Sequence, residues 1–228
     1  MDYFQQFLFG VYPYVAATIF LLGSLIRFDR EQYTWKSDSS QLLRRGQLRW
    51  GSNLFHIGIL FLFFGHAVGL LTPHHIYEGL GLSIAAKQLL AMASGGVAGL
   101  LCLAGIALLL HRRLSEPRIR KTSKPMYIFI LLWIFITLLL GLTTILFSMQ
   151  HLEGSEMLAL SAWAQHIVTF RGDAATYVLN VPLIYKVHLF SGMTLFLLFP
   201  FSRLVHIWSG FASLGYLGRA YQVVRQRS

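Results

Sequence analysis

The stretch SNLFHIGILFLFFGH, at residues 52–66, decides the fold because it places two histidines inside a long apolar run. A run of about 20 apolar residues crosses the hydrocarbon layer as a helix, whereas a run of about 10–14 usually does not. Working outward from this stretch, four further runs meet the same criterion. We therefore predict an all-α membrane protein, a bundle of five transmembrane helices, at residues 7–25, 54–71, 89–110, 126–147 and 181–208.

The composition indicates the same class of protein. Of the 228 residues, 55% are hydrophobic and only 12% are charged, which excludes an ordinary soluble domain. Because the connections are short, we predict one membrane domain over residues 1–208 and a basic C-terminal tail over 209–228. The first run is preceded by Asp2 rather than by basic residues, and Pro13 interrupts it, which favours a retained helix over a signal peptide.

Lysine and arginine are unevenly distributed among the connections, and this predicts the orientation. Cytoplasmic connections carry an excess of these residues. The second and fourth connections hold only Lys87 and Arg171, so we predict that the N-terminus is periplasmic and the C-terminus cytoplasmic. The basic residues assigned to the cytoplasmic side are Arg27, Arg30, Lys36, Arg44, Arg45, Arg49, Arg112, Arg113, Arg118, Arg120, Lys121, Lys124, Arg219, Arg225 and Arg227.

Two other features exclude alternative classes. The formal net charge of +10 does not indicate nucleic-acid binding, because topology alone explains charges at the ends of spans. The single cysteine, Cys102, cannot form a disulfide within the chain, and we expect a small buried hydrophobic side chain there. No C-x-x-C-H motif is present, so a covalently attached c-type haem is excluded.

Four of the nine histidines lie inside the second and fifth apolar runs: His56, His66, His188 and His206. An ionisable side chain in hydrocarbon is costly and normally faces the bundle interior, where it serves a ligand, a proton path or a partner. The other five lie in connections or at span ends, where a solvated or interfacial side chain is the simpler interpretation. Two histidines on each of two helices are hard to explain by packing alone.

The predicted topology pairs these histidines by depth. The second and fifth helices run in opposite directions, so His66 and His188 lie toward the outside and His56 and His206 toward the cytoplasm. On a continuous fifth helix, His188 and His206 would share one face about 27 Å apart, whereas His56 and His66 are about 15 Å apart. Helix tilt has to absorb the difference of about 12 Å. Each pair can hold a haem iron from both sides, whereas zinc needs three or four ligands close together.

Several segments closely resemble the γ subunit of respiratory membrane-bound nitrate reductase, and the resemblance covers nearly the whole chain. The segments are YPYVAATIFLLGS (12–24), QYTWKSDSSQ (32–41), SNLFHIGILFLFFGH (52–66), LTPHHIYE (71–78), QHLEGSEML (150–158) and GMTLFLLFPFSRLVHIWS (192–209). The resemblance implies a multi-pass subunit of the bacterial inner membrane that carries two b-type haems and oxidises quinol. It also implies two partners: an iron–sulfur β subunit that receives the electrons and a molybdenum-containing α subunit that reduces nitrate.

Carried over residue by residue, the resemblance implies that His66 and His188 bind the outer haem and that His56 and His206 bind the inner one. It places quinol oxidation beside the outer haem, at Lys87, His66 and Gly65. A lysine that extends its amine to the membrane interface is the alternative interpretation of Lys87. Gly65 either makes room for a flat macrocycle or packs helices closely.

Two further functions remain open at this point. One is a homologous haem b, quinone-interacting subunit of a different respiratory complex, of the sulfur or heterodisulfide type, which the neighbouring genes would distinguish. The other is a haem-free anchor or small transporter that uses the histidines as a proton relay. A visible spectrum of the protein would separate that alternative from a cytochrome b.

Overall fold

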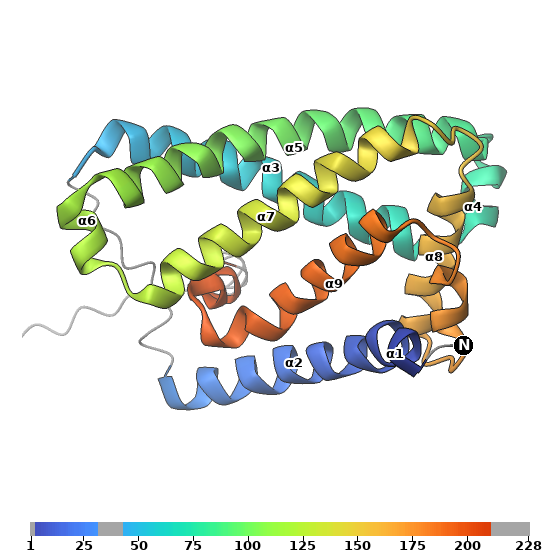
Figure 1. Ribbon diagram of the computed structural model, residues 1–228, viewed down its shortest axis with the longest axis horizontal. Helices are drawn as coiled ribbons and strands as arrows, with labels where there is room; N and C mark the ends of the chain where they lie inside the picture. The colour runs from blue at the N-terminus through green and yellow to red at the C-terminus, as the bar shows by residue number, and fades with distance from the viewer. Residues whose placement is uncertain (1–2, 32–42, 211–228) are drawn as a thin grey trace, which may run out of the picture.

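A computed structural model describes residues 3–31 and 43–210 as a bundle of helices, without a strand in these ranges (Figure 1). The predicted tail at 209–228 lies outside the described residues from position 211 onward. The helical elements are α1 (Tyr3–Gln6), the π-helical turn η1 (Phe7–Val11), α2 (Tyr12–Glu31), α3 (Arg45–Leu71), α4 (His74–Gly79), α5 (Ile84–Ser115), α6 (Pro117–Thr122), α7 (Pro125–Ser148), α8 (Ser155–Val168), the 3₁₀ turn η3 (Ala174–Val178), α9 (Leu183–Leu198), and the 3₁₀ turns η4 (Phe199–Phe201) and η5 (Arg203–Val205).

Five helical stretches are long and apolar enough to cross a membrane, which confirms the predicted number of spans. The predicted end of the second span, Leu71, is the last residue of α3, and the fourth span agrees with α7 to within one residue at each end. The stretches are Tyr3–Glu31, Arg45–Leu71, Ile84–Ser115, Pro125–Ser148 and Leu183–Phe201.

The prediction of one continuous fifth helix over 181–208 is wrong. Regular helix α9 ends at Leu198 and is followed by the short turns η4 and η5, with Ser202 between them in an extended conformation (φ −116°, ψ 179°). Pro200 explains the interruption, because proline has no N–H to donate and its ring clashes with the preceding turn of a helix. His206 therefore does not continue the helix that carries His188.

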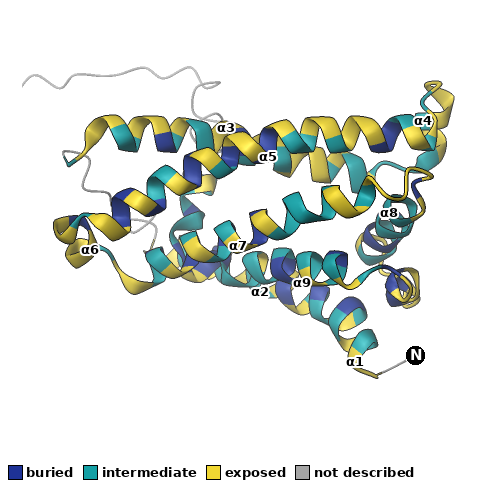
Figure 2. Ribbon diagram, turned by 45° about the horizontal axis from the view of Figure 1, so that its top comes forward, coloured by how far each residue is buried: buried dark blue, intermediate teal, exposed yellow. Residues whose placement is uncertain are grey.

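Large apolar side chains face outward along the long helices, as Figure 2 shows by the exposed residues on every span. Phe61 on α3 is 70% exposed and Leu100 on α5 is 61% exposed. In water such a surface would aggregate, whereas in lipid it is solvated. This pattern supports a membrane location for the bundle.

The two ends of the bundle differ in charge. The end that carries α6 also carries the end of α2 and the start of α3 (Figure 1), and most of the lysines and arginines of the described residues lie there. The opposite end carries α4 and α8. The sequence prediction assigned it Lys87 and Arg171 but overlooked Lys186, which lies in the first turn of α9 and donates to the carbonyl of Leu179 at 2.7 Å. The asymmetry on which the orientation was predicted persists with this addition.

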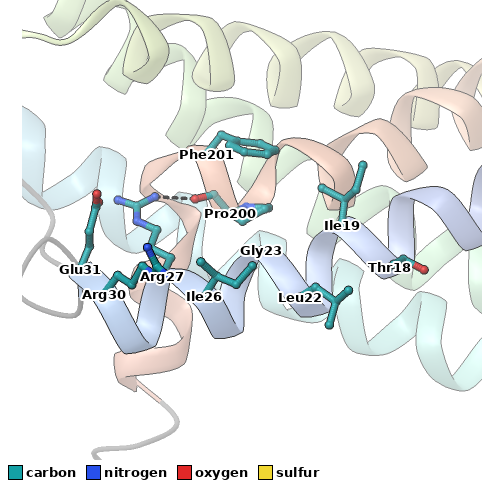
Figure 3. Close-up of a pocket in the computed structure, with 10 residues that line it drawn as sticks. All are labelled: Thr18, Ile19, Leu22, Gly23, Ile26, Arg27, Arg30, Glu31, Pro200 and Phe201. Atoms are coloured by element: carbon teal, nitrogen blue, oxygen red, sulfur yellow. Dashed lines mark hydrogen bonds between the residues drawn. The ribbon is translucent and has the colours of Figure 1, made fainter.

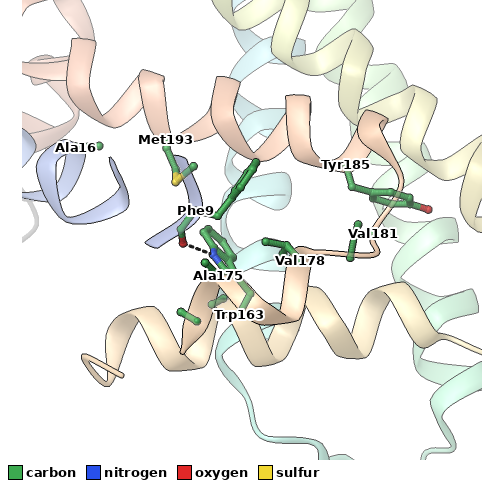
Figure 4. Close-up of a cluster of buried hydrophobic side chains, with 10 residues drawn as sticks. Phe9, Ala16, Trp163, Ala175, Val178, Val181, Tyr185 and Met193 are labelled. Atoms are coloured by element: carbon green, nitrogen blue, oxygen red, sulfur yellow. Dashed lines mark hydrogen bonds between the residues drawn. The ribbon is translucent and has the colours of Figure 1, made fainter. Parts of the chain in front are cut away.

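α8 lies across one end of the bundle and is hydrogen-bonded to the first span and to α3. Trp163 of α8 donates its indole N–H to the carbonyl of Phe9 at 2.9 Å, inside a buried cluster that includes Val178 and Met193 (Figure 4). Gln165 donates to the carbonyl of Leu70, at the last turn of α3. These bonds satisfy backbone groups at helix ends and at the π-helical turn, where the regular ladder leaves acceptors free.

α3 and α5 approach each other closely through glycines. A β-carbon at Gly58 would lie 2.6 Å from the carbonyl oxygen of Ala98, and one at Gly105 would collide with the backbone nitrogen of Phe55. Cys102 lies in this contact and is fully buried, as expected for a small hydrophobic residue. The long helices contact one another in the order α3, α5, α7, α9 and α2. α3 and α9 are thus separated by α5 and α7 in this order.

Candidate haem-binding and quinol-binding sites

The four predicted ligand histidines form two pairs. In the first pair His66 of α3 faces His188 of α9, and in the second His56 of α3 faces His206, which follows η5. The rings of His66 and His188 have centroids 6.2 Å apart, and those of His56 and His206 have centroids 6.1 Å apart. The first pair lies toward the α8 end of the bundle and the second toward the α6 end. These are the pairs predicted from depth, although the continuous helix assumed for that prediction does not exist.

The ring spacing fits a metal held from both sides. An iron bound to two imidazole nitrogens at about 2 Å each brings the ring centroids to about 6 Å. Among the described residues, no group of three or more histidine, cysteine, aspartate or glutamate side chains could hold a metal ion. Two protein ligands suffice for haem, because the porphyrin supplies the other four. The donor sets therefore fit haem better than a bare metal ion.

Hydrogen bonds at Nδ1 orient three of the four rings. His66 bonds the carbonyl of Leu62, His56 that of Ser52 and His206 that of Arg203, each at 2.7 Å. A carbonyl oxygen only accepts, so Nδ1 carries the proton in each ring and Nε2 keeps a free lone pair. This is the tautomer that a metal-ligating imidazole needs, and such bonds fix the ring orientation.

The ring of His188 is oriented by packing instead. A β-carbon at Gly141 of α7 would lie 2.9 Å from Cε1 of His188 and 3.4 Å from its Nε2. Its Nδ1 is buried and makes no hydrogen bond of normal geometry to the described residues. Trp133 on the same helix donates to the carbonyl of Ser191 at 3.1 Å, which helps to hold α7 against α9. Gly141 was not predicted as a site residue, although it is the single glycine of the apolar run 126–147. The sequence does not show that this glycine meets His188.

Open space surrounds the glycines beside the histidine pair at the α8 end. Within 4 Å of a β-carbon built on Gly65, Gly69 or Gly192, no atom is found apart from the adjoining chain. Of the two interpretations given for Gly65, close helix packing is therefore not supported. A flat ring beside His66 and His188 would use this space.

Lys87 lies in the first turn of α5 and is only 5% exposed. Its Nζ lies 3.9 Å from the centroid of the Tyr77 ring, and the Tyr77 hydroxyl donates to the carbonyl of Val68 at 2.8 Å. Val68 follows His66 by two residues on α3, so these contacts connect the lysine to the end of the helix that carries the histidine. A lysine that reaches for the interface extends its amine toward water, and Lys87 does not.

Tyr77 is a residue that the sequence analysis missed. It stands in the quoted segment LTPHHIYE, but only the folded connection places its ring against the ammonium group of Lys87. An ammonium on an aromatic face gains about 0.5–2 kcal/mol, more when it is desolvated. The signal available in the sequence was an aromatic residue ten positions before the only lysine of this connection.

Three of the five remaining histidines lie beside carboxylates, as expected for interfacial side chains. His74 approaches Glu78 at 3.0 Å and His151 approaches Glu153 at 3.7 Å. His166 donates to the carboxylate of Asp173 at 2.7 Å, and this bond holds the pKa of that carboxyl below its usual range. These contacts give those side chains a structural role at the membrane surface.

Comparison with known proteins connects this geometry to a family. Residues 5–227 match the family described as "Nitrate reductase gamma subunit". Two chains of Escherichia coli strain K12 are each 52% identical to this chain over its whole length: the respiratory nitrate reductase 1 gamma chain, covered completely, and the respiratory nitrate reductase 2 gamma chain, covered to 99%. The nitrate reductase gamma chain of Bacillus subtilis is 38% identical over 98% of this chain and 99% of its own length.

Proposed function

Because the chain belongs to the nitrate reductase gamma subunit family, we propose that it is the quinol-oxidising, di-haem b membrane-anchor subunit of a respiratory nitrate reductase. It accepts electrons from quinol at one end of the bundle and delivers them at the other end to an iron–sulfur β subunit. Nitrate is reduced on a molybdenum-containing α subunit. The chain is thus part of an oxidoreductase complex of the bacterial inner membrane.

The single observation that carries this proposal is the occurrence of two histidine pairs at two levels of one bundle, each with the ring spacing that fits an iron between them. We assign His66 and His188 to the outer haem and His56 and His206 to the inner haem. The bound haems supply one-electron redox chemistry. The protein holds them by its imidazoles, whose Nδ1–H groups are committed to backbone carbonyls in three of the four cases.

The quinol site is assigned to the region of Lys87, His66 and Gly65. The buried Nζ of Lys87 donates a hydrogen bond to a quinol oxygen, which orients the ring and stabilises negative charge on that oxygen as its proton leaves. Gly65 leaves room for a flat ring beside His66. Burial and the contact with Tyr77 keep the lysine amine away from bulk water. These features favour a quinol role over an interfacial lysine.

The charge difference between the ends supports the proposed orientation, with the basic α6 end in the cytoplasm. Quinol oxidation then takes place near the outer face and releases its protons there. The electrons move inward, toward the end that carries His56 and His206. Each turnover therefore separates charge across the membrane, which is the energetic purpose of such an arrangement.

A reduced-minus-oxidised visible spectrum and a haem determination on the purified complex test the proposal. We expect a b-type α-band, two haems per chain, reduction of both by quinol and reoxidation by nitrate. A chain without haem would be the anchor or transporter weighed above. A chain whose haems are reduced by quinol but not reoxidised by nitrate would serve a different respiratory complex.

A further inference from the structure

The interrupted fifth span creates free backbone acceptors at the level of the inner histidine pair. Pro200 cannot donate to the helical ladder, and Ser202 is extended, so carbonyl groups between them leave the regular α-helical pattern. Irregular backbone within a membrane is tolerated only where its polar groups find partners inside the protein. The carbonyls of Pro200 and Ser202 therefore need donors from another element.

Arg27 of α2 is that donor. Its Nη1 donates to the carbonyl of Pro200 at 2.7 Å and to that of Ser202 at 2.8 Å. Figure 3 shows the guanidinium pointing from α2 to the Pro200 carbonyl. Hydrogen bonds from a charged donor are about twice as strong as neutral ones, so this contact fixes both sides of the extended residue.

α2 is shaped to bring the guanidinium to this position. Gly23 lies one turn before Arg27, and a β-carbon there would stand 2.8 Å from Cγ of Pro200 and 2.9 Å from its Cβ. Phe20, almost one turn earlier, packs edge-on against Phe199 with ring centroids 4.8 Å apart. The apolar contact, the glycine and the arginine thus follow one face of α2 along the interruption.

The interrupted segment leads directly to His206. Ser202 Oγ accepts from the backbone N–H of Leu204 at 3.2 Å and starts the turn η5. The carbonyl of Arg203, in this turn, accepts the hydrogen bond from Nδ1 of His206. The backbone that Arg27 holds is therefore continuous with the backbone that sets the direction of the His206 ring.

We propose that Arg27 is a positioning residue for the inner haem: by binding the carbonyls of Pro200 and Ser202 it places the His206 imidazole opposite His56. The proposal rests on the assignment of these two histidines to a haem. The excess of positive charge on the cytoplasmic side does not explain this role of Arg27. That excess requires a basic residue near the end of the span, but it does not require hydrogen bonds to two particular carbonyl groups.

The test compares Arg27→Lys and Arg27→Leu with Arg30→Lys and Arg30→Leu in the assembled complex. Arg30 is exposed on the same helix end and provides the matched charge control. Both bonds come from Nη1, at the far end of the guanidinium. Lysine retains the charge, but its shorter side chain places the ammonium short of that position, so it does not reach both carbonyls. The readouts are the midpoint potential and the ferric electron paramagnetic resonance signal of each haem, because that signal depends on how the two axial rings are oriented.

For both Arg27 variants we expect a shifted inner-haem signal and about tenfold faster loss of the inner haem, a typical effect of residues that orient metal ligands. The outer haem stays unchanged and reports that the protein is inserted and folded. An unchanged inner haem in Arg27→Lys, or an equal shift in Arg30→Lys, overturns the proposal. His206→Ala distinguishes failure of the haem assignment from failure of the role of Arg27. If His206→Ala retains both haems, the haem assignment is wrong. If His206→Ala loses the inner haem while Arg27→Lys is normal, only the role of Arg27 is overturned.

Discussion

The imidazole of His188 lies directly against the backbone of Gly141, where a β-carbon would come within 2.9 Å of its Cε1. Real β-carbon contacts are essentially never that short, so a side chain at position 141 forces the ring or α7 to move. The ring of His188 also faces His66, and a displacement changes the spacing between the two.

Gly141→Ala is therefore expected to weaken binding of the outer haem and to leave the inner haem in place. The control is Gly95→Ala on α5, because a β-carbon there meets no atom within 4 Å outside the adjoining helix and the residue has no part in the proposed haem site. Haem content and redox titration of both variants provide the measurement. Equal outer-haem content in Gly141→Ala and the wild type would contradict this prediction, because it would show that α7 can move away from His188 without weakening haem binding.

Removal of single histidines tests the pairing. His66→Ala and His188→Ala are each expected to remove the outer haem and largely spare the inner one. His56→Ala and His206→Ala should do the reverse, because each variant removes one of the two histidines that would hold the haem. The haem-to-protein ratio and the remaining midpoint potential identify the lost haem. If His56→Ala and His188→Ala removed the same haem, the assignment by pairs would be wrong.

Lys87→Ala is expected to slow reduction of the haems by quinol about 10²-fold, the lower end of the range of about 10²–10³ for loss of a charge-stabilising donor. It should also weaken binding of quinol-analogue inhibitors. Stopped-flow reduction in membranes with the assembled complex measures the rate, and intact haem content is the necessary control. Tyr77→Phe keeps the aromatic face under the ammonium and should retain most of the rate. Wild-type kinetics and inhibitor affinity in Lys87→Ala would remove the proposed quinol role.

Gly105→Ala is expected to destabilise the bundle by about 1–3 kcal/mol, the usual cost of overpacking. A β-carbon there collides with the backbone of Phe55 and pushes α3 from α5. Gly95→Ala on the same helix serves as the control, because its β-carbon meets no atom within 4 Å outside the adjoining helix and alanine favours helix. Thermal unfolding in detergent compares the two. A lower melting temperature in Gly95→Ala than in Gly105→Ala would contradict this account of the α3–α5 contact.

Reporter fusions test the orientation. A cytoplasm-active reporter fused after residue 228 should be active, and a periplasm-active one should be silent, because the basic connections remain on the inner side. The opposite pattern would mean that His56 and His206 bind the outer haem and that His66 and His188 bind the inner one. Haem content of each fusion confirms that the bundle is folded.

The number of spans and some of their boundaries were predictable from sequence because a membrane imposes a simple length rule. A helix needs about 20 apolar residues to cross it, so α3 ends at the predicted Leu71 and α7 departs from its prediction by one residue at each end. The depth of each histidine follows from the same rule together with the alternating direction of the helices. The pairs His66–His188 and His56–His206 were accessible in this way.

The course of the fifth span was not predicted, although its signal was present in the sequence. Eighteen residues between His188 and His206 suggested five continuous turns, and the resulting mismatch of about 12 Å in height was assigned to helix tilt. Pro200 in the segment FPFS is the residue that explains the actual course. It ends the helix after Leu198, and the two short turns that follow bring His206 to His56.

By itself the sequence determined the number of spans and the two histidines in each of the second and fifth apolar runs, because hydrophobic length is a local property of the chain. Only the tertiary structure decided which residues orient those histidines. Arg27 reaches Pro200 across 173 positions, and Gly141 meets His188 through the packing of α7 on α9. Such contacts depend on how helices approach one another in three dimensions. An arginine that holds an interrupted helix and one that marks the cytoplasmic side look alike in a sequence, since both stand at the end of an apolar run.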